Sequence, residues 1–182
     1  MKYWLLLLAV PLLTQCKGKD EKADAFFPVA SFLKGQVKAL DSSLATFTKI
    51  ESANGRNDTT IISRQDAQAL ARDFMQLPTI DAGDYTETQQ YDDLIQQVVI
   101  NQMPKETDAP IQRQAVLIQP GPVGEEDKVK TIIVDQLLNE KAGTVQKNLL
   151  WEVDAKFQIT TITAQGPNRV QVIWTDRPMQ QR

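Results

Sequence analysis

The sequence predicts an α+β fold in which two N-terminal helices, with a β-hairpin between them, pack on an antiparallel meander sheet. Apolar residues recur at helical spacing in two segments before residue 78, and apolar and polar residues alternate in short segments after residue 110. Turns containing Gly or Pro separate those later segments. Short links favour antiparallel pairing, so we expect about five strands with the helices on one face.

The first predicted helix begins near Pro28, because proline suits the first turn of a helix. Its apolar residues recur every three or four positions: they are Val29, Phe32, Leu33, Val37 and Leu40. The helix should end near residues 41–43. A hairpin is predicted next, since residues 44–51 and 58–62 are rich in β-branched side chains and Asn54-Gly55 between them tolerates positive φ.

The second predicted helix starts at Ser63, which reads as an N-cap with Asp66 as its partner three positions later. Its apolar stripe faces the core and consists of Ala67, Leu70, Ala71, Phe74 and Met75. Leu77-Pro78 ends it. A lipid-binding role for the Phe74-Met75 pair is the alternative to a place in the core.

Residues 79–106 are rich in acids and predict a solvated loop that leads to an edge strand at 94–103. The carboxylates that form candidate surface-site residues are Asp81, Asp84, Glu87, Asp92 and Asp93. No calcium-binding loop spacing joins them. They are either a solvated acidic surface or a carboxylate site for a cation or a sugar.

The remaining strands are predicted at 111–119, 128–139, 144–154, 157–164 and 169–175. Trp151 and Trp174 alternate with polar residues, so we expect both rings in the core. The polar residues of the opposite face are Gln146, Asn148, Glu152, Gln158, Thr160, Arg169 and Gln171. This face is either a solvated surface or a surface that binds a protein strand or a glycan.

The N-terminus predicts a secretory signal. Lys2 supplies a positive charge, and residues 3–13 form an apolar run of eleven residues that is too short to span a bilayer. The run ends at Cys16, the one cysteine in the chain. Leu13, Thr14, Gln15 and Cys16 resemble the lipobox of bacterial lipoproteins, although Thr14 and Gln15 are bulkier than the residues usual there.

The resemblance implies cleavage before Cys16 and lipidation of the Cys16 sulfur, with palmitate among the acyl groups. It therefore implies that the protein is attached to a membrane. Acyl chains anchor a protein by about 0.8 kcal/mol per buried methylene. The organisation we expect is a cleaved signal at 1–15, a flexible charged tether at 16–25, a domain at 26–176 and a tail at 177–182. We expect the protein in the bacterial cell envelope, anchored to the outer membrane. Two alternatives stay open for its side of that membrane: facing the periplasm or facing the cell surface.

Composition restricts the chemistry. The chain has no histidine, and lipid would consume its single cysteine. Ser-His-Asp and Cys-His catalysis and the usual zinc, haem and iron–sulfur ligand sets are therefore excluded, and no cofactor is expected. Cleavage of the predicted signal removes Lys2, which leaves 19 of the 20 basic residues against 23 acidic ones. The mature protein would therefore be mildly negative, which argues against a nucleic-acid partner.

Two functional hypotheses follow. The favoured one is a non-catalytic, lipid-anchored envelope lipoprotein that binds an envelope protein, peptide or glycan. The alternative is a carboxylate-dependent enzyme such as a glycoside hydrolase, which needs two facing carboxyl groups across a cleft. Its candidates are the five acids above together with Glu125 and Glu126.

Overall fold

The structure is a computed structural model that describes residues 26–140 and 143–175. The predicted signal, Cys16, the predicted tether and the predicted C-terminal tail lie outside the described residues. Among the described residues, no helix has both the length and the apolar character needed to cross a membrane.

The described strands form one antiparallel sheet of nine strands in the order β2-β1-β9-β8-β7-β6-β5-β4-β3. Their bounds are β1 Thr46–Ala53, β2 Arg56–Ile62, β3 Tyr85–Asp92, β4 Gln97–Pro104, β5 Ile111–Gln119, β6 Lys128–Glu140, β7 Gly143–Glu152, β8 Lys156–Thr163 and β9 Gly166–Thr175. Strands β3 to β9 form a meander, which confirms the α+β class and the antiparallel pairing predicted from short links.

The predicted hairpin extends the sheet because β1 pairs with β9. Asn54 and Gly55 form its two-residue turn, with φ of 51° and 75°. Positive φ at both central positions matches the twist of a tight hairpin, and an Asn-Gly pair adopts it at low cost. The turn therefore sets the register in which Ala53 pairs with Arg56.

The prediction of a meander of about five strands was wrong, since β3 to β9 make seven, and the hairpin adds two more to the described sheet. The acidic segment predicted as a loop contains strand β3, and the strand predicted at 94–103 is β4 at 97–104. β3, and not the predicted strand β4, lies at the edge of the sheet, where water reaches its side chains. It therefore lacks the apolar alternation of a half-buried strand.

The expectation of two N-terminal helices is not confirmed. Helix α1 spans Val29–Ala39 and continues into a short 3-10 turn, η1, at Leu40–Ser42. The second predicted helix is two short pieces, α2 at Arg64–Leu70 and α3 at Arg72–Met75. Ala71 separates them with ψ of 9°, which leaves the helical range although the apolar stripe continues.

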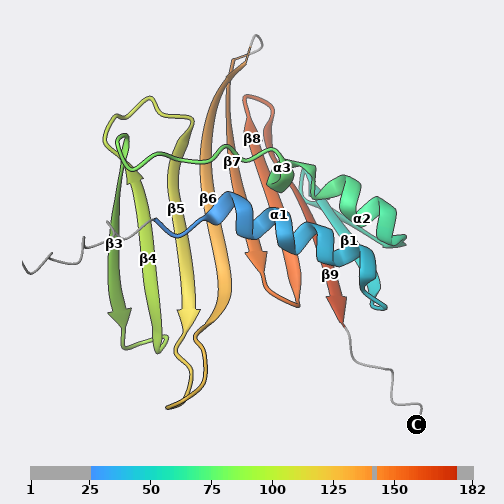
Figure 1. The fold of residues 1–182 in the computed structure, drawn as a ribbon. Coiled ribbons are helices and arrows are strands. Elements are labelled where there is room, and N and C mark those ends of the chain that lie inside the picture. Colours follow the sequence, from blue (N-terminus) through green and yellow to red (C-terminus); the bar gives the residue numbers. More distant parts are fainter. Residues whose placement is uncertain (1–25, 141–142, 176–182) are drawn as a thin grey trace, which may run out of the picture.

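The helices lie on one face of the sheet, and α1 crosses it from β6 toward β9 (Figure 1). Beneath them is an aromatic cluster in which Trp151 stacks on Phe157 at 5.5 Å. Trp174 lies 5.5 Å from Trp151, and Phe74 of α3 meets Trp151 edge-on at 5.1 Å. The prediction that both tryptophans are in the core is confirmed, and so is the place of Phe74.

The opposite face, called here the uncovered face, carries no helix among the described residues (Figure 1). Leu150, Ile133 and Ala115 lie side by side across β7, β6 and β5. Leu117 pairs with Val99 in the next row. These five residues are called the apolar strip, and none belongs to the core cluster under the helices.

Candidate ligand-binding cavity

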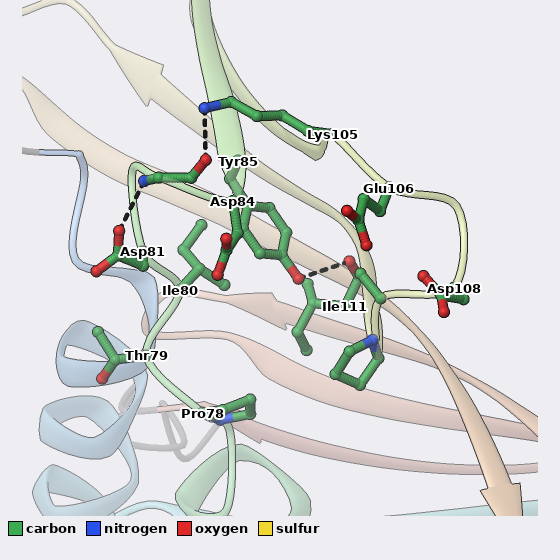
Figure 2. Close-up of a pocket in the computed structure, with 13 residues that line it drawn as sticks. Pro78, Thr79, Ile80, Asp81, Asp84, Tyr85, Lys105, Glu106, Asp108 and Ile111 are labelled. Atoms are coloured by element: carbon green, nitrogen blue, oxygen red, sulfur yellow. Dashed lines mark hydrogen bonds between the residues drawn. The ribbon is translucent and has the colours of Figure 1, made fainter.

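A cavity of about 460 Å³ opens where β3 begins and the β4–β5 loop passes over it (Figure 2). One wall is the segment at 78–85 and the other is the loop at 105–111. In Figure 1 the first of these segments crosses the helix-covered face on its way from α3 to β3. The cavity therefore lies at one end of the sheet, beside the helical layer.

Hydrogen bonds hold the first wall in a tight turn. Asp81 Oδ1 accepts from the Gly83 amide at 2.6 Å, and its carbonyl accepts from the amides of Asp84 and Tyr85 at 3.1 Å each. Lys105 closes the turn from the other wall, since its Nζ donates to the Gly83 carbonyl at 2.6 Å (Figure 2). The same Nζ also donates to the Ala82 carbonyl at 3.2 Å. The two walls are thus tied together.

Tyr85 lies on the inner side of the cavity and is buried. Its hydroxyl donates to the Ile111 carbonyl at 3.0 Å, which joins β3 to the start of β5 (Figure 2). Burial raises the pKa of Tyr85 above its ordinary value of 10.0, the hydrogen bond to Ile111 opposes this, and the charge of Asp84 adds to it. The phenol therefore stays protonated and serves as a structural donor.

Four exposed carboxylates border the cavity, contributed by Asp81, Asp84, Glu106 and Asp108. Lys105 is the one cation among the lining residues, and it makes no salt bridge within the described part of the chain. The excess of negative charge favours cationic or hydroxyl-rich ligands. No group of three or more acids in the described residues is arranged to hold a metal ion.

The structure brings together two of the five predicted site residues, Asp81 and Asp84. Glu87 points to the helix side, where its carboxylate accepts from the Phe27 amide at 3.0 Å and from Gln102 Nε2 at 2.6 Å. This fixes the chain just before α1 and gives Glu87 a structural role.

The other predicted acids lie far from the cavity. Asp92 ends β3 and accepts from the amides of Leu94 and Ile95, so it serves the β3–β4 turn, and Asp93 is exposed in that turn. Asp92 lies eight positions after Asp84 along the extended strand β3, a distance of about 26 Å at 3.3 Å per residue. Glu125 and Glu126 are exposed in the β5–β6 loop and do not line the cavity.

The polar residues predicted opposite the core lie on the uncovered face, as their register with Leu150 and Ile133 requires. Three of them, Gln158, Thr160 and Arg169, line a shallow hollow of about 510 Å³ beside the β1–β2 turn. Arg169 donates there to Ser52 Oγ at 3.2 Å.

The prediction missed the apolar strip on this face. The signal was present as adjacent apolar residues at Val98-Val99, Val116-Leu117, Ile132-Ile133 and Leu149-Leu150. Neighbours in a strand point to opposite faces, so such pairs indicate a sheet that is apolar on both sides. Sequence reasoning also missed the buried glutamines Gln102 and Gln114, which have no spacing signature.

No family model matches this chain, and no match was found among curated proteins or among solved structures.

Proposed function

We propose that this chain is a lipid-anchored lipoprotein of the bacterial cell envelope that binds a partner protein through the uncovered face of its sheet. The lipid would be carried by Cys16, as the lipobox resemblance implies. The observation that supports a binding role is the apolar strip, in which Leu150, Ile133, Leu117 and Val99 are half-buried and Ala115 is buried although no described helix covers them. Apolar side chains left partly open to water on an uncovered sheet face favour contact with a partner.

The surroundings of the strip resemble the anatomy of a protein interface, with an apolar centre and a polar rim. Gln158 on β8 pairs with Leu150 at one end of the strip, and Asn101 on β4 pairs with Ala115 at the other end. A further polar row contains Arg113, whose Nε donates to Asp135 at 2.9 Å. Rim groups of this kind set orientation, while the strip supplies the buried area.

A protein fits this surface better than a glycan does. A glycan presents mainly hydroxyl groups, and burying them against aliphatic side chains leaves hydrogen bonds unmade. The strip is aliphatic throughout, so it favours a partner with apolar side chains of its own.

Site-specific photocrosslinking in the native host tests this proposal. A photoreactive residue at position 150 should yield a discrete adduct, whereas one at Lys38, exposed on α1, should not. Purified partner should then bind the protein saturably. Ile133→Lys should weaken that binding about tenfold or more, because it places a charge in the apolar centre, and Thr88→Lys, at the edge of the same face, should leave it unchanged.

Equal adducts from both positions, or an unchanged affinity in Ile133→Lys, would contradict the binding surface. Unfolding curves of both lysine variants separate loss of binding from loss of fold.

The second candidate function is hydrolysis of a glycan, and the observation that favours it is the group of carboxylates around the 460 Å³ cavity. All four are exposed, whereas a general acid is usually kept protonated by burial. If the cavity is catalytic, Asp84→Asn should abolish release of reducing sugar from envelope glycans, and Asp93→Asn should not. Wild-type protein without such release excludes this candidate.

A further inference from the structure

A second cavity, of about 260 Å³, lies under the first turn of α1. Residues 26–31 form one side, the segment at 78–82 forms the other, and Gln114 of β5 lines it from the sheet. It shares residues 78–81 with the larger cavity and is bordered in addition by the start of α1. Its apolar walls include Phe26, Phe27 and Ile80.

The start of α1 supplies hydrogen-bond donors that have no acceptor. Pro28 precedes the helix and offers no side-chain cap, and the first turn contains no acidic residue. The amides of Val29 and Phe32 donate to backbone carbonyls, whereas those of Ala30 and Ser31 meet no acceptor within the described residues. An uncapped helix start with free amides favours an oxygen with negative charge.

Gln114 is an independent sign of a binding site. The residue is 1% exposed, and its Nε2 has no hydrogen-bond partner among the described residues. A buried amide left unpaired is costly, so an acceptor in the cavity would relieve it. Residues that carry unpaired donors, Ala30 and Ser31 on the helix and Gln114 on the sheet, thus line the same small space.

We infer that this cavity binds a carboxylate carried on a short apolar group. The carboxylate would accept hydrogen bonds from the amides of Ala30 and Ser31 and from Gln114 Nε2, and the apolar group would contact Phe26, Phe27 and Ile80. Such a group occurs in a free short-chain acid and at the C-terminus of a peptide. This site lies on the helix-covered face and is independent of the partner surface proposed above.

Asp81 opposes the inferred charge, because its carboxylate also lines the cavity. One oxygen is engaged by the Gly83 amide, so Asp81→Asn can keep that hydrogen bond while removing the charge. A carboxylate ligand should therefore bind more tightly to Asp81→Asn, whereas a cationic ligand should bind more weakly. This single variant gives opposite results for the two kinds of ligand.

Gln102 offers a competing partner within the protein. It faces Gln114 across β4 and β5, and its Oε1 is also unpaired. Its Nε2 donates to the Phe27 carbonyl at 2.9 Å and to Glu87, which holds the amide in this orientation. If Gln114 instead donates to Gln102 Oε1, replacing Gln114 should not affect carboxylate binding.

The test is an amide NMR titration of the full chain with butyrate, butyramide and butylammonium, and in a second arm with trialanine and its C-terminal amide. Butyrate or trialanine should shift the Ala30, Ser31 and Gln114 side-chain signals saturably, and the uncharged and cationic analogues should not. Binding of butyrate alone indicates a free acid, and binding of trialanine indicates a peptide terminus.

Gln114→Met should weaken binding roughly tenfold, since it removes one donor to a charged group. Gln136→Met is the matched control, because Gln136 is buried on the same face and does not line the cavity. Absence of saturable shifts with either carboxylate, equal binding by the neutral analogues, or no effect of Gln114→Met in a folded protein overturns the inference.

Discussion

Phe74 links the helical layer to the sheet through contacts with two aromatic rings. It is fully buried and meets Trp151 at 5.1 Å and Phe157 at 5.6 Å, both in edge-to-face arrangements. Phe74→Ala should lower the free energy of unfolding by about 3–5 kcal/mol, because it removes buried area and leaves a cavity. Urea denaturation measures this change.

Ile61→Ala serves as the control for this prediction. Ile61 is 75% exposed on β2, so its truncation should change stability by less than about 0.5 kcal/mol. A comparable loss in both variants would contradict the assigned role of Phe74.

Tyr85 makes stability depend on alkaline pH. Burial raises the pKa of its phenol above 10.0, so the unfolded chain loses this proton at a lower pH than the folded protein does. The contribution of Tyr85 is fully present below pH 10 and should decline as the pH rises through the raised pKa of the folded state. Urea denaturation between pH 8 and 11.5 measures it.

Tyr85→Phe provides the comparison, because it cannot ionise and loses the hydrogen bond to Ile111. It should be less stable by about 1 kcal/mol at pH 8. The difference from wild type should shrink at alkaline pH. A stability difference between wild type and Tyr85→Phe that stays constant with pH would show that ionisation of the Tyr85 phenol is not coupled to unfolding.

At the scale of elements, the start of α2 depends on one reciprocal cap. Ser63 Oγ accepts from the Asp66 amide at 3.1 Å, and the Asp66 carboxylate accepts from the Ser63 amide at 3.4 Å. Ser63→Ala should cost about 1 kcal/mol in thermal or urea unfolding, because it leaves a helix amide unpaired. Ser63→Thr keeps the hydroxyl and should retain most of the stability; equal losses would mean that the cap is not responsible.

The elements also explain why one predicted acidic cluster separated into three parts. Strand β3 runs between Asp84 and Asp93, so these acids lie at opposite ends of the sheet. Glu87 in the middle of the strand turns toward the helices, and Asp81 and Asp84 alone remain at the cavity. A loop at residues 79–93 could bring its acids close together. A strand cannot, because it extends by about 3.3 Å per residue.

At the scale of the whole molecule, the anchor remains a prediction that rests on Cys16. Protein from the native host should begin at this residue and carry diacylglyceryl and acyl groups, and Cys16→Ala should leave the membrane fraction. Intact-mass spectrometry with fractionation measures both. A free thiol or another N-terminus would contradict the lipoprotein assignment and leave the carboxylate cavity unaffected.

The sequence by itself determined the antiparallel pairing, the Asn54-Gly55 turn, the cap at Ser63 and the inward side of Trp151 and Trp174, because these depend on spacing along a few neighbouring residues. Tertiary structure alone decided that nine strands join one sheet, that Asp81 and Asp84 border a cavity with Lys105, and that Gln114 lies under the uncapped start of α1. Those arrangements join residues far apart in the chain. The periodicity of side chains predicts local structure and does not predict which distant segments come into contact.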